Sequence, residues 1–267
     1  MQYIKLKHRS IAMPENWNEL ILPQLFTLAV YGMRKLTVQH LKVSMLLATM
    51  KARVMRKVGD GVYRLSFGPL RRSVILTLAE GQALAENFSF LVAKRGDTHH
   101  IDSHLTRDHF PKLRIGGHRF YGPGDVLEHL TYEQFMWCQT YLQRMQTEPQ
   151  LLTHLLATLW HTGRRFDVSH VDRDARLIAR LPIPTQIVMM WTWEGSLSFI
   201  QHKFPRIFSA DGEGSGGNVF ESQLRIIDAL AGGDMTKKDA VRQGYLYDAL
   251  VTMDESLRQR EEQKHHT

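Results

Sequence analysis

The stretch PTQIVMMWTW, residues 184–193, is the most strongly apolar helical segment that this chain of 267 residues predicts. Pro184 is suited to the first turn of a helix, where a missing backbone N–H costs no hydrogen bond. The residues that follow leave hardly any polar face, which is typical of a buried helix. The apolar run at 187–193 is far shorter than the ~20 residues that a bilayer-spanning helix needs. We therefore expect this helix to be the most buried in the protein.

Further helices are expected on both sides of this segment. Thr37 and Thr77 are suited to cap helices over 37–58 and 77–91, and TYEQ at 131–134 resembles a capping box. The other expected elements are helices at 18–31 and 150–160 and short strands at 3–6 and 62–65. The sequence thus predicts a mainly α-helical protein, an irregular helical bundle with a few short N-terminal β-strands.

The predicted domain organisation has three parts. Residues 1–210 form the mainly helical core domain, with short strands and a long irregular loop at 94–124. A loop of this length is usually functional or adapted to a partner. The tract DGEGSGG at 211–217 is typical of a flexible linker. Residues 218–267 form a C-terminal helical appendage, in which two helices meet at a Gly-Gly-Asp stop, 232–234.

The composition is that of an ordinary globular protein. Hydrophobic residues make up 43% and charged residues 23%, which argues against wholesale disorder. The net charge of +7 is unevenly placed: residues 1–100 hold 15 Lys and Arg against 6 Asp and Glu, and residues 101–267 hold 19 against 21. The basic part could attract nucleic acid or an acidic protein surface. A charge excess that only keeps the protein in solution is the simpler alternative.

The cysteine content argues against a disulfide-stapled protein. Cys138 is the single cysteine of the sequence, so we expect no disulfide framework and no all-cysteine zinc site. Its aromatic neighbours indicate a small buried residue rather than a nucleophile. The chain starts without the apolar stretch and cleavage site of a signal peptide. We expect a protein of an intracellular, reducing compartment.

One dense cluster of metal-ligating residue types lies in the irregular loop. In a helix, His100, His104 and Asp108 would share one face at i, i+4 and i+8, a spacing that could hold zinc with one open position for hydrolysis. No HExxH motif accompanies them and the segment reads as loop, so a solvated polar loop is the favoured interpretation. We predict no metal and no cofactor, and keep a metal-dependent hydrolase as a third alternative.

Elsewhere no enzyme motif is complete. Gly212, Gly214 and Gly217 match GxGxxG, but the strand and helix that flank a dinucleotide-binding loop are not expected there. A GxSxG nucleophile elbow does not occur. Paired carboxylates such as Asp172 and Asp174 lie in charged surroundings that do not predict raised pKa values. We therefore predict that the protein is not an enzyme and has no catalytic residues.

The expected helix 37–58 carries a basic side. Arg53, Arg56 and Lys57 lie on it and could hold phosphates, so a protein that contacts nucleic acid is the second functional alternative. No helix-turn-helix or zinc finger supports that interpretation. A solvated helix face explains these charges more simply.

Several phrases in a consistent order over nearly the whole chain carry a family resemblance. They are PENWNEL (14–20), FL (90–91), PKL (111–113), FYGPGDVL (120–127), LTYEQF (130–135), LLATLW (155–160) and LAGGDMTK (230–237). Together they resemble proteins encoded among the tail morphogenesis genes of tailed phages and prophages in Bacteroidetes-like bacteria. None of these phrases is a catalytic signature.

This resemblance implies a tail assembly chaperone or a minor tail component, which binds tape-measure or tube subunits before they polymerise. It implies action by protein–protein contact, in the cytoplasm of the host cell or in the virion, without a membrane partner. Flexible methionines on exposed surfaces suit such contacts. The partner-binding candidates are Met45, Met50, Arg53, Met55, Arg56, Lys57, Tyr121, Asp125, Tyr245 and Leu246.

Overall fold

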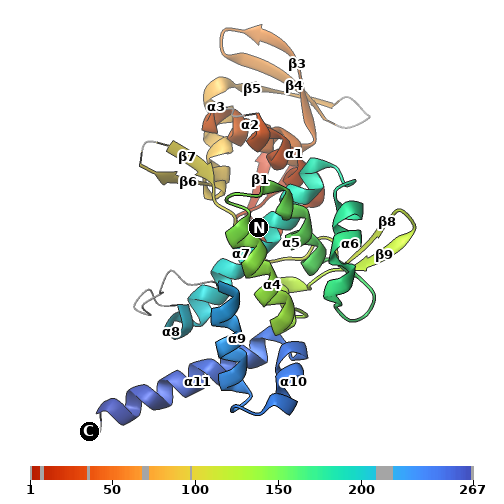
Figure 1. Ribbon diagram of the computed structural model, residues 1–267. Coiled ribbons are helices and arrows are strands. Elements are labelled where there is room, and N and C mark those ends of the chain that lie inside the picture. Colours follow the sequence, from red (N-terminus) through yellow and green to blue (C-terminus); the bar gives the residue numbers. More distant parts are fainter. Residues whose placement is uncertain are drawn as a thin grey trace. The chain divides into compact units, whose positions relative to one another are not determined.

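The structure is a computed structural model that describes residues 2–6, 9–34, 37–67, 72–96, 98–208 and 219–265 (Figure 1). The chain divides into two compact units, Met1–Leu105 and Thr106–Thr267. The linker predicted at 211–217 lies outside the described residues. Within the described part of the chain, no helix is both long and apolar enough to span a membrane.

The first unit combines helices with small antiparallel sheets. Its elements in chain order are β1 (Gln2–Leu6), β2 (Arg9–Met13), the 3-10 turn η1 (Trp17–Glu19), α1 (Leu22–Met33), α2 (Val38–Met50), β3 (Ala52–Gly59), β4 (Val62–Phe67), β5 (Arg72–Thr77), α3 (Leu78–Ala85), η2 (Glu86–Leu91), β6 (Val92–Arg95) and β7 (Thr98–Ile101). Strands β1 and β2 form one hairpin, β6 and β7 another, and β3, β4 and β5 form a three-stranded sheet in that order.

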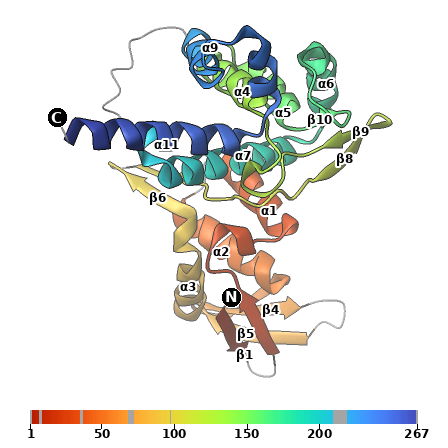
Figure 2. The same cartoon turned by 90° about the horizontal axis from the view of Figure 1, so that it is seen from below.

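The second unit is richer in helices. Its elements are β8 (Lys112–Ile115), β9 (His118–Tyr121), η3 (Asp125–Leu127), α4 (Tyr132–Arg144), η4 (Pro149–Leu151), α5 (Leu152–Leu159), β10 (His161–Thr162), η5 (Val168–His170), α6 (Val171–Ile178), α7 (Ile183–Lys203), α8 (Pro205–Phe208), α9 (Val219–Leu230), η6 (Met235–Lys237), α10 (Lys238–Gln243) and α11 (Leu246–His265). Strand β9 lies between β8 and β10. Helices α9, α4, α5 and α6 lie side by side in a row (Figure 2).

Side-chain caps begin several helices where the sequence predicts them. Thr37 Oγ1 accepts the N–H of His40 at the start of α2. At α3, Thr77 and Glu80 cap each other's backbone, and at α4 Thr131 does so with Gln134. These reciprocal bonds satisfy N–H groups that a helix start leaves without partners. The starts of α2, α3 and α4 are therefore set by local chemistry.

Each unit buries a core of its own. The first unit fully buries aromatic and aliphatic side chains that include Trp17, Leu25, Leu28, Met45, Phe88 and Leu91. In the second unit, α7 supplies Val188, Met189 and Trp193, which are completely buried, and the Trp193 ring lies 6.2 Å from that of Phe135. The apolar pattern of 184–193 thus corresponds to a helix inside the core of this unit.

The expectation of a mainly α-helical bundle with a few N-terminal strands is wrong. Helices account for 60% and strands for 19% of the structure, and the strands form four small sheets within the described residues. The fold is therefore mixed α and β. Strands occur in both units, so they are not confined to the N-terminal part.

The predicted helix 37–58 is one place where this expectation fails. Helix α2 ends at Met50, because Lys51 adopts a left-handed conformation with φ 49°. The chain then continues as β3, which pairs with β4 along its length. The apolar residues that continue the helical spacing, Val54 and Met55, lie in this strand. The local pattern fitted both structures, and cross-strand pairing decided between them.

The predicted irregular loop 94–124 is a second place where the expectation of a mainly helical fold fails. It contains β7 and the β8–β9 hairpin, whose turn is Gly116-Gly117 with φ values of 55° and 84°. A two-residue hairpin turn of type I′ requires positive φ at both positions, which glycine adopts without strain. Ile115 pairs with His118 directly across this turn. Two glycines between short alternating segments are therefore a hairpin signal rather than a loop signal.

The C-terminal helices, predicted as an appendage over 218–267, belong to the second unit. The Leu246 N–H donates to the Leu130 carbonyl at 2.8 Å, and the Tyr132 N–H donates to the Gly244 carbonyl at 2.9 Å. The Tyr132 hydroxyl also donates to Gln223 on α9 at 2.5 Å. These bonds attach the turn before α11, and α9 itself, to the start of α4.

Asp108 organises the segment that leads from β8 to α4. One carboxylate oxygen accepts the Phe110 N–H at 2.8 Å and the other accepts the Gly124 N–H at 3.2 Å. Trp160 closes the same cluster with an indole N–H that donates to the Phe110 carbonyl at 3.0 Å. Because Asp108 is buried, desolvation raises the pKa of its carboxyl group above the ordinary value. Asp108 is thus a structural acceptor.

Gly122 allows this cluster to close. A Cβ at residue 122 would collide with the Asp108 carboxylate and would lie 2.7 Å from Trp160 Nε1 and 2.9 Å from the Phe110 carbonyl oxygen. We expect Gly122→Ala to lower the free energy of unfolding by about 3 kcal/mol, the upper range for overpacking. Urea unfolding followed by circular dichroism measures this change.

Gly81, on helix α3, is the control for this substitution. Apart from its chain neighbours and the backbone of its own helix, no atom of the described residues lies within 4 Å of a Cβ built at this position, so Gly81→Ala should stabilise the protein by roughly 0.5–1 kcal/mol through helix propensity. Equal stability of the two variants would contradict the proposed role of Gly122.

Candidate functional site

The structure separates the partner-binding candidates by exposure. Met45, Met50 and Leu246 are buried in the cores and are therefore not available to a partner. The exposed candidates are Arg53, Met55, Arg56 and Lys57 on β3, Asp125 on η3 and Tyr245 before α11, while Tyr121 on β9 is half-buried. The exposed partner-binding candidates of the first unit thus all lie on strand β3.

The three metal candidates do not share a helical face. His100 lies on β7, His104 lies in the irregular segment after it, and the Asp108 carboxylate accepts backbone N–H groups. His104 is exposed and lies 3.4 Å from the carboxylate of Asp102. Among the described residues, no group of three or more His, Cys, Asp or Glu is arranged to hold a metal ion. The helical spacing that motivated a zinc site does not exist in the fold.

The sheet β3–β4–β5 carries a basic face. Directly opposed residues of antiparallel strands have their side chains on the same face. Arg56 pairs with Arg64 and Arg53 pairs with Ser66, while Arg64 also pairs with Ile75 on β5. Three arginines therefore lie together on one face of this sheet. The opposite face packs on the core through buried residues, which are Leu65, Phe67 and Leu76.

These arginines have no carboxylate partners among the described residues. The ion pair that the described part of the sheet does contain joins Lys57 to Asp60 at 2.9 Å. Arg64 Nε is buried and finds no hydrogen-bond partner in the described structure. Like charges that face each other across a strand pair are destabilising. An anionic partner at this face would relieve that repulsion.

Strand β3 is also an edge strand of this sheet (Figure 1), and it carries exposed apolar side chains. Val54, Met55 and Val58 are each about half exposed or more, at 51%, 58% and 46%. A register shift between Val54 and Arg56 leaves Met55 as the extra residue of a bulge. The outer edge of β3 pairs with no other described strand, so its backbone groups are open to a further strand.

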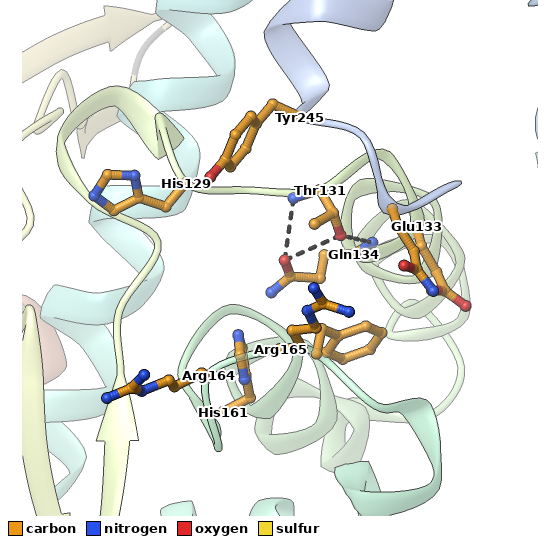
Figure 3. Close-up of a pocket in the computed structure, with 10 residues that line it drawn as sticks. His129, Thr131, Glu133, Gln134, His161, Arg164, Arg165 and Tyr245 are labelled. Atoms are coloured by element: carbon orange, nitrogen blue, oxygen red, sulfur yellow. Dashed lines mark hydrogen bonds between the residues drawn. The ribbon is translucent and has the colours of Figure 1, made fainter. Parts of the chain in front are cut away.

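The second unit contains a pocket of about 400 Å³ near the start of α4 (Figure 3). Its walls come from three stretches of chain that are distant in sequence. The lining residues are His129, Thr131, Glu133, Gln134, His161, Arg164, Arg165, Phe166, Gln243 and Tyr245. In Figure 3 the Arg165 guanidinium and the His161 ring point toward Gln134, whereas Arg164 points away from them.

The arginine side of the pocket is positioned by Asp174. This buried carboxylate accepts the Thr162 N–H at 2.9 Å and the Thr162 hydroxyl at 2.8 Å, which fastens the end of β10 to α6. Gly163 follows with φ 93°, a conformation that favours glycine, and turns the chain toward Arg165. Arg173 pairs with Asp174 at 2.9 Å, whereas Arg165 pairs with no carboxylate of the described residues.

Burial shifts the pKa values of two groups in the pocket. Desolvation lowers the pKa of His161, an effect partly opposed by its hydrogen bond to the Thr162 carbonyl. Desolvation also raises the pKa of Glu133, although the charge of Arg242 acts in the other direction. Perturbed groups in a cleft mark a candidate binding site. No local motif connects the walls of this pocket, so the sequence pattern predicts only one of its residues, the partner-binding candidate Tyr245.

The lowered pKa of His161 generates a pH prediction. The unfolded chain should protonate this ring near the ordinary value of 6.5, above the folded value. Below that pH the unfolded state therefore binds more protons, and the free energy of unfolding falls as pH falls. We expect the difference in unfolding free energy between the wild type and His161→Gln to decrease from pH 7.5 to pH 5.

Urea titrations at several pH values measure this difference, and NMR of the imidazole ring gives the folded titration midpoint. A midpoint at or above 6.5, or a difference that does not depend on pH, would contradict the assignment.

Comparisons with protein families, with curated proteins and with solved structures found no match for this chain. Relatives therefore add no functional residue to those that the geometry identifies. The basic sheet of the first unit and the pocket of the second unit are the candidate sites.

Proposed function

We propose that this protein is a non-enzymatic phage tail morphogenesis factor that binds a tail subunit through the edge of its β3–β4–β5 sheet. The tape-measure or tube subunit as partner follows from the resemblance of the sequence phrases. The observation that carries the proposal is strand β3, an exposed edge strand with both apolar and basic side chains.

The edge of β3 suits an extended polypeptide. An added strand would form main-chain hydrogen bonds with the open edge, and the neighbouring side chains would select its sequence. Val54, Met55 and Val58 offer apolar contact to such a segment. Methionine is flexible and polarizable, so it adapts to partners of different shape. Binding of this kind makes and breaks no covalent bond in the partner.

The charge of the sheet specifies an acidic segment. Arg53, Arg56 and Arg64 share one face and have no carboxylate partner among the described residues. Carboxylates of a partner would form charge-assisted hydrogen bonds with the exposed guanidinium groups. They would also remove the repulsion between Arg56 and Arg64. Complementary charge speeds association and suppresses wrong partners.

Nucleic acid is the alternative partner for strand β3 and the arginines beside it. Three arginines would attract phosphates as well as carboxylates. The exposed aliphatic side chains of β3 favour a protein, because phosphates gain nothing from contact with Val54, Met55 or Val58. The described outer face also lacks an aromatic platform on which bases stack.

Capture of tail polypeptides tests the proposal. The tagged full-length chain is co-expressed with the tape-measure and tube genes of the same genome, and bound polypeptides are identified by mass spectrometry. We expect one of these subunits to be recovered at moderate salt. Met55→Glu combined with Arg56→Glu should lower recovery at least tenfold, because it removes apolar contact and reverses a charge.

Ile183→Glu combined with Arg260→Glu is the matched control. It likewise changes one apolar residue and one arginine to glutamate, at exposed positions of the second unit, and should leave recovery unchanged. Failure to capture either subunit, or equal capture by the β3 variant, would contradict the proposal. Duplex DNA binding with a steep salt dependence, lost in the β3 variant and without subunit capture, would establish the alternative.

A further inference from the structure

We propose that the pocket of the second unit binds a carboxylate group, with Arg165 as its principal ligand. This inference goes beyond the tail-assembly function and does not depend on it. The pocket is enclosed by the start of α4, the loop after β10 and the segment between α10 and α11 (Figure 3). Its volume of about 400 Å³ lies at the lower end of the usual range for small-ligand sites.

The polar groups that remain available in the pocket are mainly donors. Thr131 and Gln134 already satisfy each other, since the Gln134 amide oxygen accepts both the N–H and the hydroxyl of Thr131. The Gln134 amide nitrogen donates to the Thr158 carbonyl at 2.7 Å. A ligand would therefore meet the Arg165 guanidinium and the Tyr245 hydroxyl instead. Both can donate to an anion.

The charges of the pocket favour an anion. Arg165 directs its positive charge into the pocket, and Arg164 adds a second charge nearby although its side chain points away; Glu133 is the single carboxylate among the lining residues. Neither arginine is paired with a carboxylate of the described residues, in contrast to Arg173. A guanidinium that lacks an internal partner binds a carboxylate through two parallel hydrogen bonds. Arg165 is directed into the pocket and can supply that fork.

Glu133 decides which anion fits. Its carboxyl group lines the same pocket, so a dianionic phosphate would meet more repulsion there than a carboxylate with one negative charge. The Phe166 ring lies 5.8 Å from the His161 ring in an edge-on arrangement and provides an apolar wall. The ligand class is therefore a carboxylate attached to an apolar or aromatic group. A small organic acid and the C-terminus of a peptide share this chemistry.

Titration of the full-length protein with benzoate tests the site. Signals of the His161 ring and of the Arg165 side chain are followed by NMR. We expect saturable shifts with a dissociation constant on the order of 1 mM, as for a fragment-sized ligand. Inorganic phosphate should bind more weakly. Arg165→Gln should weaken benzoate binding about tenfold or more, and Arg165→Lys should weaken it less, because the charge remains but the fork is lost.

Arg144→Gln is the matched control, because Arg144 pairs with Glu148 on the surface of α4 and lies outside the pocket. It should bind benzoate like the wild type. Two peptides with an aromatic last residue, one with a free and one with an amidated C-terminus, distinguish the sources of the carboxylate. Binding of the free form alone supports a chain terminus, and binding of benzoate without either peptide supports a small acid.

Three results would overturn the proposal. They are the absence of saturable benzoate shifts in the wild type, equal benzoate affinity in the wild type and Arg165→Gln, and tighter binding of phosphate than of benzoate. Each of these readouts is separate from the capture of tail subunits, so failure of either proposal leaves the other testable.

Discussion

The buried carboxylate of Asp108 is the constraint on which the second unit depends. It holds the backbone at Phe110 and Gly124 together, and these residues flank the β8–β9 hairpin. Strand β9 in turn pairs with β10, which leads into the loop that carries Arg165. The geometry of the pocket thus depends on the Asp108 carboxylate. Burial disfavours its charged form, and backbone N–H groups satisfy its oxygen atoms.

The turn at Val126 and Leu127, which follows this cluster, contacts helix α11. Val126 and Leu127 adopt positive φ values of 55° and 62°, a conformation that is costly for a β-branched residue. The Tyr247 hydroxyl donates to the Val126 carbonyl at 3.1 Å, so α11 contacts the strained turn directly. Backbone bonds from Leu246 and Gly244 join the same region. The strained turn persists because packing on both sides holds it.

The two candidate sites share one electrostatic feature, which is arginine that pairs with no carboxylate among the described residues. Elsewhere in the described structure many arginines have carboxylate partners, such as Arg206 with Asp254 and Glu261. At the sheet, Arg53, Arg56 and Arg64 form an open surface suited to an extended acidic chain. At the pocket, Arg165 lies in a confined space suited to a single carboxylate. The binding that we propose at both sites depends on charge and shape, which accords with the proposed role in assembly.

The sequence alone determined three helix starts, because capping is a contact between residues three positions apart, whereas the helix expected from residue 18 begins at Leu22 without a side-chain cap. Thr37, Thr77 and Thr131 therefore identified α2, α3 and α4. It did not determine where α2 ends, since the spacing of Met50 and Val54 fits a helix as well as a strand and only the pairing with β4 decides. The pocket combines residues near positions 131, 165 and 245, and only tertiary structure brings such distant segments together. Capping depends on neighbours along the chain, whereas sheets and pockets depend on contacts that a linear pattern does not contain.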